Sequence, residues 1–204
     1  MDLPLLSRLS NETRDLHELV KASPLHRSIV DGTVTRHSYI RLLQRLYGVH
    51  SSFERYAGGR KEWFSLHFNF DERRKLPLLE RDLTALGSAP GAVQPPAAPL
   101  PLQGANFHFL LGYLYVLEDS TLAGQELIRF IVRHLGLVPD WGAAYFYGYG
   151  PLTAGRWRNL QSLLTRFEET GMEADLMVQG ARDAFSRINS WLRAGIYVEE
   201  AVAV

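Results

Sequence analysis

The chain has 204 residues, of which 46% are hydrophobic and 22% are charged. These fractions are ordinary for a folded globular protein, and they argue against both disorder and a membrane span. Basic and acidic residues number 22 each, so no overall positive field is present to attract nucleic acid. The absence of cysteine excludes disulfides, thiolate metal sites and cysteine nucleophiles. Any metal site must therefore use histidine, aspartate or glutamate.

The length of the chain suits one domain, and we predict a single domain over residues 1–204. No apolar run reaches the roughly 20 residues that a membrane-spanning helix needs, because Asp119, Ser120 and Thr121 interrupt the longest candidate. The N-terminal residues lack a basic segment followed by an apolar one, so they do not resemble a secretory signal. We therefore expect a cytoplasmic protein with no membrane attachment and no nucleic-acid partner.

The first quarter of the chain shows helical periodicity. Apolar residues at near-helical spacing predict a helix over 5–22 and a second, shorter one over about 25–30. The residue before Pro24 disfavours helix, which ends the first of them. Thr35 is a favourable N-cap for a third helix, which we expect to run to about Tyr56, before two consecutive glycines.

The remainder of the chain continues the pattern. Residues 71–86 are predicted as a helix with Gly87 as its C-cap, and the proline-rich segment 87–101 as an ordered surface loop. Residues 108–134 read as one long helix that is apolar on nearly every side, which is typical of a core position. Further predictions are an aromatic, glycine-rich loop that packs onto the core over 141–151, and amphipathic helices over 156–170 and 172–192.

The long helix has an unusual middle. Small and polar residues interrupt its apolar character over 118–124. Buried polar groups need partners, and a break of this kind needs an identifiable cause, so we expect another group to lie against it. Glu118 and Asp119 are adjacent and point about 100° apart on a helix, so they are not a converging carboxylate pair.

No stretch alternates with the period of two that strands require, so the predicted fold is all-α. The motifs HExxH, GxSxG and the P-loop are absent, which excludes the commonest zinc hydrolase, serine hydrolase and nucleotide-binding sites. His17 lies on or beside the apolar stripe of the first helix. Its imidazole is suited to ligating iron or zinc, although a partly buried histidine bonded to a backbone carbonyl is the simpler interpretation.

Several stretches together resemble the bacterial heme oxygenases, a group that includes the biliverdin suppliers of bacteriophytochromes. The segment around His17 is similar to the helix that carries the axial heme ligand of the family. Residues 111–125 are similar to its distal helix, whose glycine-containing turn passes over the iron-bound oxygen. Residues 146–150, followed by Arg156 and Arg158, also match a family pattern. The resemblance covers nearly the whole chain, and it favours the ligand interpretation of His17.

The resemblance implies that heme is both substrate and cofactor. It implies that the heme ring is opened with O2 and electrons from an external reductase or ferredoxin, which yields biliverdin, carbon monoxide and ferrous iron. His17 would be the metal ligand, and Asp119 and Ser120 would place a distal water as catalytic residues. The other heme-binding residues that it implies are Arg14, Tyr113, Tyr115, Leu122, Gly124, Arg158 and Phe185.

The chain departs from the family pattern at three positions. Asp119 and Ala123 stand where the family has glycine, and Lys21 replaces an acidic residue one turn after the axial histidine. Three roles are open for the Asp119 carboxylate: it holds a distal water, it ligates the iron, or it crowds the oxygen site. The last two motivate an alternative function, a heme-binding or heme-sensing protein without turnover. A helical interaction module without heme is a third hypothesis.

Overall fold

The computed structural model describes residues 5–89, 102–167 and 171–193. In these residues the only regular secondary structure is helical, which confirms the predicted all-α class. The predicted loop over 87–101 lies mostly outside them. The main helices are α1 (Leu5–Lys21), α2 (Pro24–Asp31), α3 (Arg36–Ala57), α4 (Glu62–Ser65), α5 (Leu76–Ala85), α6 (Phe107–Leu135), α7 (Ala144–Tyr147), α8 (Thr153–Leu164) and α9 (Gly171–Arg193). Short 3-10 turns lie at Asp71–Arg73, Gly150–Leu152 and Thr165–Phe167.

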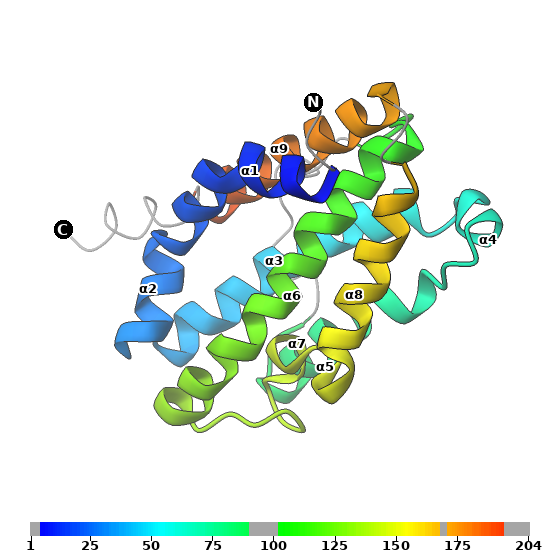
Figure 1. Ribbon diagram of the computed structural model, residues 1–204. Coiled ribbons are helices and arrows are strands. Elements are labelled where there is room, and N and C mark those ends of the chain that lie inside the picture. The colour runs from blue at the N-terminus through cyan, green and yellow to red at the C-terminus, as the bar shows by residue number, and fades with distance from the viewer. Residues whose placement is uncertain (1–4, 90–101, 168–170, 194–204) are drawn as a thin grey trace.

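Helix α6 is the centre of the arrangement (Figure 1). Helices α1 and α9 cross over one side of it, α3 and α8 lie along its flanks, and α5 and α7 pack near one another at its opposite side. The prediction that residues 108–134 form a core helix is confirmed. Its middle is not broken, because helical structure continues from Phe107 to Leu135.

The polar residues in the middle of α6 are satisfied within the helix itself. The Ser120 hydroxyl donates to the Val116 carbonyl and the Thr121 hydroxyl to the Leu117 carbonyl, each at 2.9 Å. These bonds to the preceding turn remove the cost of an unpaired hydroxyl, and they are the usual way in which serine and threonine are accommodated within a helix.

Helix boundaries follow the sequence signals at several points. Thr35 and Ser38 form a reciprocal capping box at the start of α3. Gly32, at a φ of 76°, ends α2 in the left-handed conformation that glycine tolerates best. The predicted helix over 71–86 is shorter than expected, because α5 begins at Leu76. Pro77 explains this start, since proline lacks an N–H and fits only the first turn of a helix.

Two glycines bring α6 and α9 into direct backbone contact. A Cβ added at Gly112 would lie 2.0 Å from the Met177 carbonyl oxygen, and one at Gly180 would lie 2.1 Å from the Phe109 carbonyl oxygen. These distances are far below any van der Waals contact. The close packing fixes the N-terminal half of α6 against α9.

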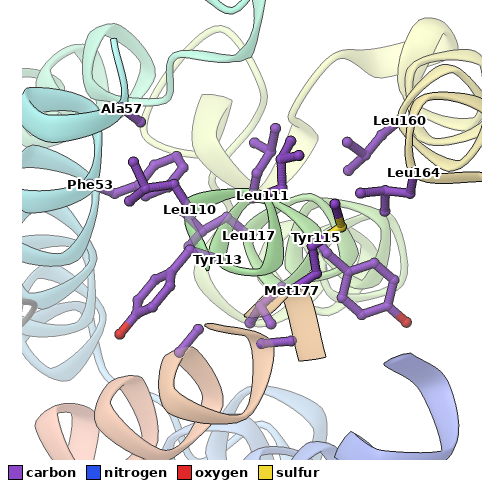
Figure 2. Close-up of a cluster of buried hydrophobic side chains, with 14 of the residues drawn as sticks. Phe53, Ala57, Leu110, Leu111, Tyr113, Tyr115, Leu117, Leu160, Leu164 and Met177 are labelled. Atoms are coloured by element: carbon purple, nitrogen blue, oxygen red, sulfur yellow. The ribbon is translucent and has the colours of Figure 1, made fainter. Parts of the chain in front are cut away.

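Buried side chains form two clusters along α6. The first gathers around its N-terminal half (Figure 2), where residues of α3, α8 and α9 converge on Leu110 and Leu111. The second joins α2, α3, α5 and α7 to the C-terminal half. The division matters for function, because the main cavity lies where these two clusters meet.

The aromatic segment after α6 packs onto the core, as predicted for residues 141–151. Asp82 of α5 is fully buried and accepts hydrogen bonds from the backbone N–H groups of Ala144 and Tyr145, both at 2.8 Å. A carboxylate at a helix N-terminus satisfies otherwise unpaired donors. Asp82 thereby fixes α7, and with it the Tyr145 and Phe146 rings, against the second cluster.

None of the helices in the described parts of the chain combines the length and apolar character that crossing a bilayer requires.

Candidate functional site

The principal cavity lies between α1, α2, α3, α6, α7 and α9 and has a volume of about 130 Å³. Its walls are mainly apolar, with a few polar side chains among leucine, valine, isoleucine and phenylalanine. The lining residues are His17, Val20, Lys21, Ser23, Leu25, His26, Ile29, Leu42, Leu46, Val49, His50, Leu117, Asp119, Ser120, Ala123, Leu127, Tyr145, Phe146, Phe185, Ile188 and Leu192. Apolar walls with few polar groups are typical of sites for small molecules and cofactors.

Helix α6 presents one face to the cavity. Ser120, Ala123 and Leu127 line it at successive intervals of three and four residues that match the turns of a helix, and Asp119 lines it beside them. Leu122 is not among the lining residues. Part of the polar middle of α6 is therefore explained, because Asp119, Ser120 and Ala123 form one wall of the cavity.

His17 projects from α1 toward this wall. Its Nε2 atom lies 3.4 Å from Oδ2 of Asp119, and its ring packs against Phe185 with the centroids 5.7 Å apart. The His17 side chain is 30% exposed and that of Asp119 is 22% exposed. The imidazole thus lies at the cavity wall, between the Phe185 ring and the Asp119 carboxyl group.

The Asp119 carboxyl is in a mixed environment. Burial raises its pKa, while the nearby His17 and Lys21 act in the opposite direction. Burial dominates because desolvation penalises the charged carboxylate. The Asp119 carboxyl group therefore lines the cavity as a largely desolvated polar group beside the His17 imidazole.

His50 and Tyr145 form a polar pair at the inner wall. The His50 Nε2 atom and the Tyr145 hydroxyl oxygen are 3.0 Å apart, and both side chains are buried. Burial is the main cause that lowers the pKa of His50 to about 3, so the imidazole is neutral at physiological pH. The pair supplies polar atoms to the cavity without adding a charge.

Cationic character is limited to the rim. Lys21 is the one lysine or arginine among the described residues that line the cavity. Its Nζ atom lies 3.5 Å from Oε1 of Glu18, and its side chain is 48% exposed. An exposed pair of this kind is weak, so Lys21 is available to an anion at the rim.

The structure brings four of the predicted site residues together and places the other six elsewhere. His17, Asp119, Ser120 and Phe185 line the same cavity. Arg14, Tyr113, Tyr115, Leu122, Gly124 and Arg158 are not among its lining residues.

The two predicted tyrosines extend from α6 in diverging directions (Figure 2). The Tyr113 ring is buried beside Phe53 and its hydroxyl donates to Asp183. Tyr115 packs against Trp157 of α8, with ring centroids 5.4 Å apart. Both rings contribute to the core rather than to the cavity wall.

The two predicted arginines lie on the protein surface. Arg14 is exposed on α1 and donates to Asn11, while Arg158 is exposed on α8. Gly124 was predicted to leave room for heme, but in the structure it lies against the backbone of α7. A Cβ at Gly124 would lie 3.0 Å from the Phe146 carbonyl oxygen, so this glycine accommodates the backbone of α7.

Sequence reasoning missed Lys21, His50 and Tyr145 as contributors to the cavity. Lys21 is one helical turn after His17, so the spacing alone would have placed both on one face of α1. His50 and Tyr145 come from elements far apart in the chain, and no local pattern signals that they meet.

The lining fits a flat apolar group that carries a metal and anionic substituents. It supplies an imidazole directed into the cavity, apolar walls on several helices, the small side chain of Ala123, and a lysine at the rim. A single histidine is a common axial ligand of heme iron. Among the described residues, no three histidine, aspartate or glutamate side chains form a group that could hold a free metal ion.

Comparisons with known proteins agree with this fit. The family model described as Heme oxygenase matches residues 3–194. A heme oxygenase of Xanthomonas campestris pv. campestris is 27% identical over 167 residues, which cover 80% of this chain and 93% of the relative. The structure of heme oxygenase from Leptospira interrogans is similar with a TM-score of 0.81 at 19% identity, covering 94% of this chain and 100% of that one.

A second solved structure, heme oxygenase-1 from the cyanobacterium Synechocystis in complex with heme, gives a TM-score of 0.80 at 19% identity, covering 98% of this chain and 96% of that one. At this identity the two structures establish a shared fold. The family model extends over nearly the whole sequence. The chain belongs to the heme oxygenase family.

Proposed function

We propose that this member of the family opens the heme ring with O2 and electrons from an external reductase or ferredoxin, giving biliverdin, carbon monoxide and ferrous iron. Family membership identifies the protein as an enzyme of heme degradation, with heme as its cofactor. The observation that carries the proposal is the His17 imidazole, which lies 3.4 Å from Asp119 at a cavity with mainly apolar walls. We also propose that the enzyme acts in the cytoplasm.

His17 is the proposed axial ligand through its Nε2 atom. The Phe185 ring, with its centroid 5.7 Å from that of the imidazole, limits the orientations available to His17. When bound, heme supplies both the iron that activates oxygen and the porphyrin that is oxidised. The protein contributes binding and orientation, and Phe185 does so through direct contact with the ligand side chain.

Lys21 is the proposed partner of a heme propionate. It lies at the rim of the cavity, one turn from His17, and its present partner Glu18 is an exposed side chain. A propionate would replace the Glu18 carboxylate as the anion beside the ammonium group. We thus assign to Lys21 the contact with a heme propionate, for which the sequence had suggested Arg158, Arg14, Tyr113 or Tyr115.

Asp119 and Ser120 are the proposed distal residues. Both belong to the face of α6 that lines the cavity, opposite His17. The Asp119 carboxyl group is suited to hydrogen-bonding a distal water, and burial raises its pKa above the ordinary value. The Ser120 hydroxyl donates to Val116, which leaves its oxygen as an acceptor toward the cavity.

Aerobic turnover tests the proposal directly. Ferric heme is added to the purified protein, the complex is reduced in air by a ferredoxin and its reductase, and absorption spectra are followed. Loss of the Soret band with the appearance of biliverdin is the expected result. Ferric heme that binds through His17 but survives aerobic reduction would instead identify a heme-binding protein without turnover. The absence of any Soret shift would contradict heme binding altogether.

A further inference from the structure

We infer that the Asp119 side chain closes the heme site through its contact with His17, and that this contact must break before heme is bound. The inference rests on the proposed function, since it assumes that heme iron binds His17 Nε2. It assigns Asp119 a role in the rate of heme binding, separate from any role in turnover.

The first argument is the distance between the two side chains. His17 Nε2 and Asp119 Oδ2 are 3.4 Å apart. An imidazole nitrogen lies about 2 Å from a metal that it ligates. An unbonded oxygen on the other side of the porphyrin needs roughly a further 3 Å or more. The two atoms must therefore separate to at least about 5 Å to admit the plane of the heme.

The second argument is the volume of the site. The cavity of about 130 Å³ is smaller than the roughly 300–1,000 Å³ of typical ligand pockets. Side chains that line it must consequently move when heme binds. Asp119 is 22% exposed, so its carboxylate can rotate toward water without crossing the core.

The third argument is that helix α6 cannot move easily. Helix α6 is in backbone contact with its neighbours on both sides of Asp119, through Gly112 against Met177 and through Gly124 against Phe146. Displacement of α6 as a rigid body would disturb both close contacts. Rotation of the Asp119 side chain about its own bonds is the smaller change, and it is sufficient to break the contact with His17.

The experiment measures the association rate of ferric heme by stopped-flow absorption at the Soret band. Three variants are compared with the wild type: Asp119→Ala, Asp119→Asn and, as a matched control, Asp175→Ala. Asp175 forms a surface ion pair with Arg8, and its side chain is 67% exposed. Neither of these two residues lines the cavity. Alanine favours helix at either position, so all variants are expected to fold, which circular dichroism verifies.

Asp119→Ala is expected to bind heme about threefold to fivefold faster than the wild type, as fits the loss of one partly exposed polar contact. Asp175→Ala should match the wild type. Asp119→Asn should be slower than Asp119→Ala, because its amide still reaches His17. Equal rates for wild type and Asp119→Ala would overturn the inference.

Equal acceleration in Asp119→Asn and Asp119→Ala would also overturn it, since repulsion between the carboxylate and the heme propionates would then account for the effect. A wild-type protein that shows no Soret shift would overturn the proposed function and the inference together. Normal heme binding with unchanged rates would leave the proposed function intact and remove the inference alone.

Discussion

Glu118 and Asp119 are consecutive residues of α6 whose carboxylates point into two unrelated environments. The Glu118 side chain is 3% exposed and lies 2.9 Å from Arg73 and 3.3 Å from Lys75, measured between charged atoms. Asp119 faces His17 at 3.4 Å in the cavity. The angle of about 100° between adjacent helical residues separates the two roles. Glu118 therefore supports the fold, and Asp119 belongs to the site.

Glu118→Gln is expected to lower the free energy of unfolding by about 3 kcal/mol, because it leaves Arg73 and Lys75 buried without their anion. Urea denaturation measures the change. Glu12→Gln is the matched control, since the Glu12 side chain is 44% exposed in its pair with Arg8, and it should change stability by less than about 0.5 kcal/mol. A comparably small effect for Glu118→Gln would contradict the structural role of this cluster.

The backbone contact between α6 and α9 gives a second prediction. Gly112→Ala would place a Cβ 2.0 Å from the Met177 carbonyl oxygen, so we expect a loss of at least about 3 kcal/mol or failure to fold. Gly155 lies in α8 with no atom near its would-be Cβ, and Gly155→Ala should stabilise the protein by up to about 1 kcal/mol. Thermal melts of both variants provide the comparison. Similar melting temperatures would show that the two helices are not held this closely.

The pH dependence of the free energy of unfolding should include a contribution from His50. Burial is the main cause that lowers its pKa to about 3, against about 6.5 in an unfolded chain. Below pH 6.5 the unfolded chain binds a proton that the folded imidazole does not. The contribution of His50 to stability is thus intact above about pH 6.5 and falls by about 1.4 kcal/mol per unit as the pH drops further.

His50→Gln removes this titration. The loss of unfolding free energy between about pH 7.5 and pH 5.5 should be about 1 kcal/mol smaller in the variant than in the wild type. All other residues are the same in both proteins, so their contributions cancel in the comparison. An identical pH dependence would indicate that His50 takes up a proton in the folded protein.

Lys21→Ala is expected to weaken heme binding by about threefold to tenfold, the range for loss of one partly exposed charge-assisted contact. Arg158→Ala should leave the dissociation constant unchanged, because Arg158 is exposed on α8 and does not line the cavity. Soret titrations of both variants measure the constants. The reverse pattern would support Arg158 as the propionate partner and contradict the position assigned to heme.

Local signals in the sequence predicted most of the fold. Apolar periodicity identified the main helices, and Thr35 and the prolines marked several of their ends. The start of α5 was predicted too early, because the polar residues 71–75 fit a helical pattern that Pro77 interrupts. The single long helix predicted over 108–134 is confirmed, and the hydroxyl groups in its middle find partners one turn back.

The site was predicted less completely than the fold. His17, Asp119, Ser120 and Phe185 meet at one cavity, but Tyr113 and Tyr115 do not join them. The reason is physical: a helix that is apolar on nearly all sides carries no periodic signal that tells one buried face from another. Only tertiary packing shows which face of α6 contacts α9 and which lines the cavity.

The measurement that tests the central claim most directly is the spectrum of the ferric heme complex in three proteins: the wild type, His17→Ala, and His26→Ala as a control from the same cavity lining. The wild type and His26→Ala should show the same histidine-ligated spectrum. His17→Ala should lose it, and free imidazole should restore it by occupying the position of the missing side chain. A histidine-ligated spectrum that persists in His17→Ala would contradict the assignment of this residue as the axial ligand.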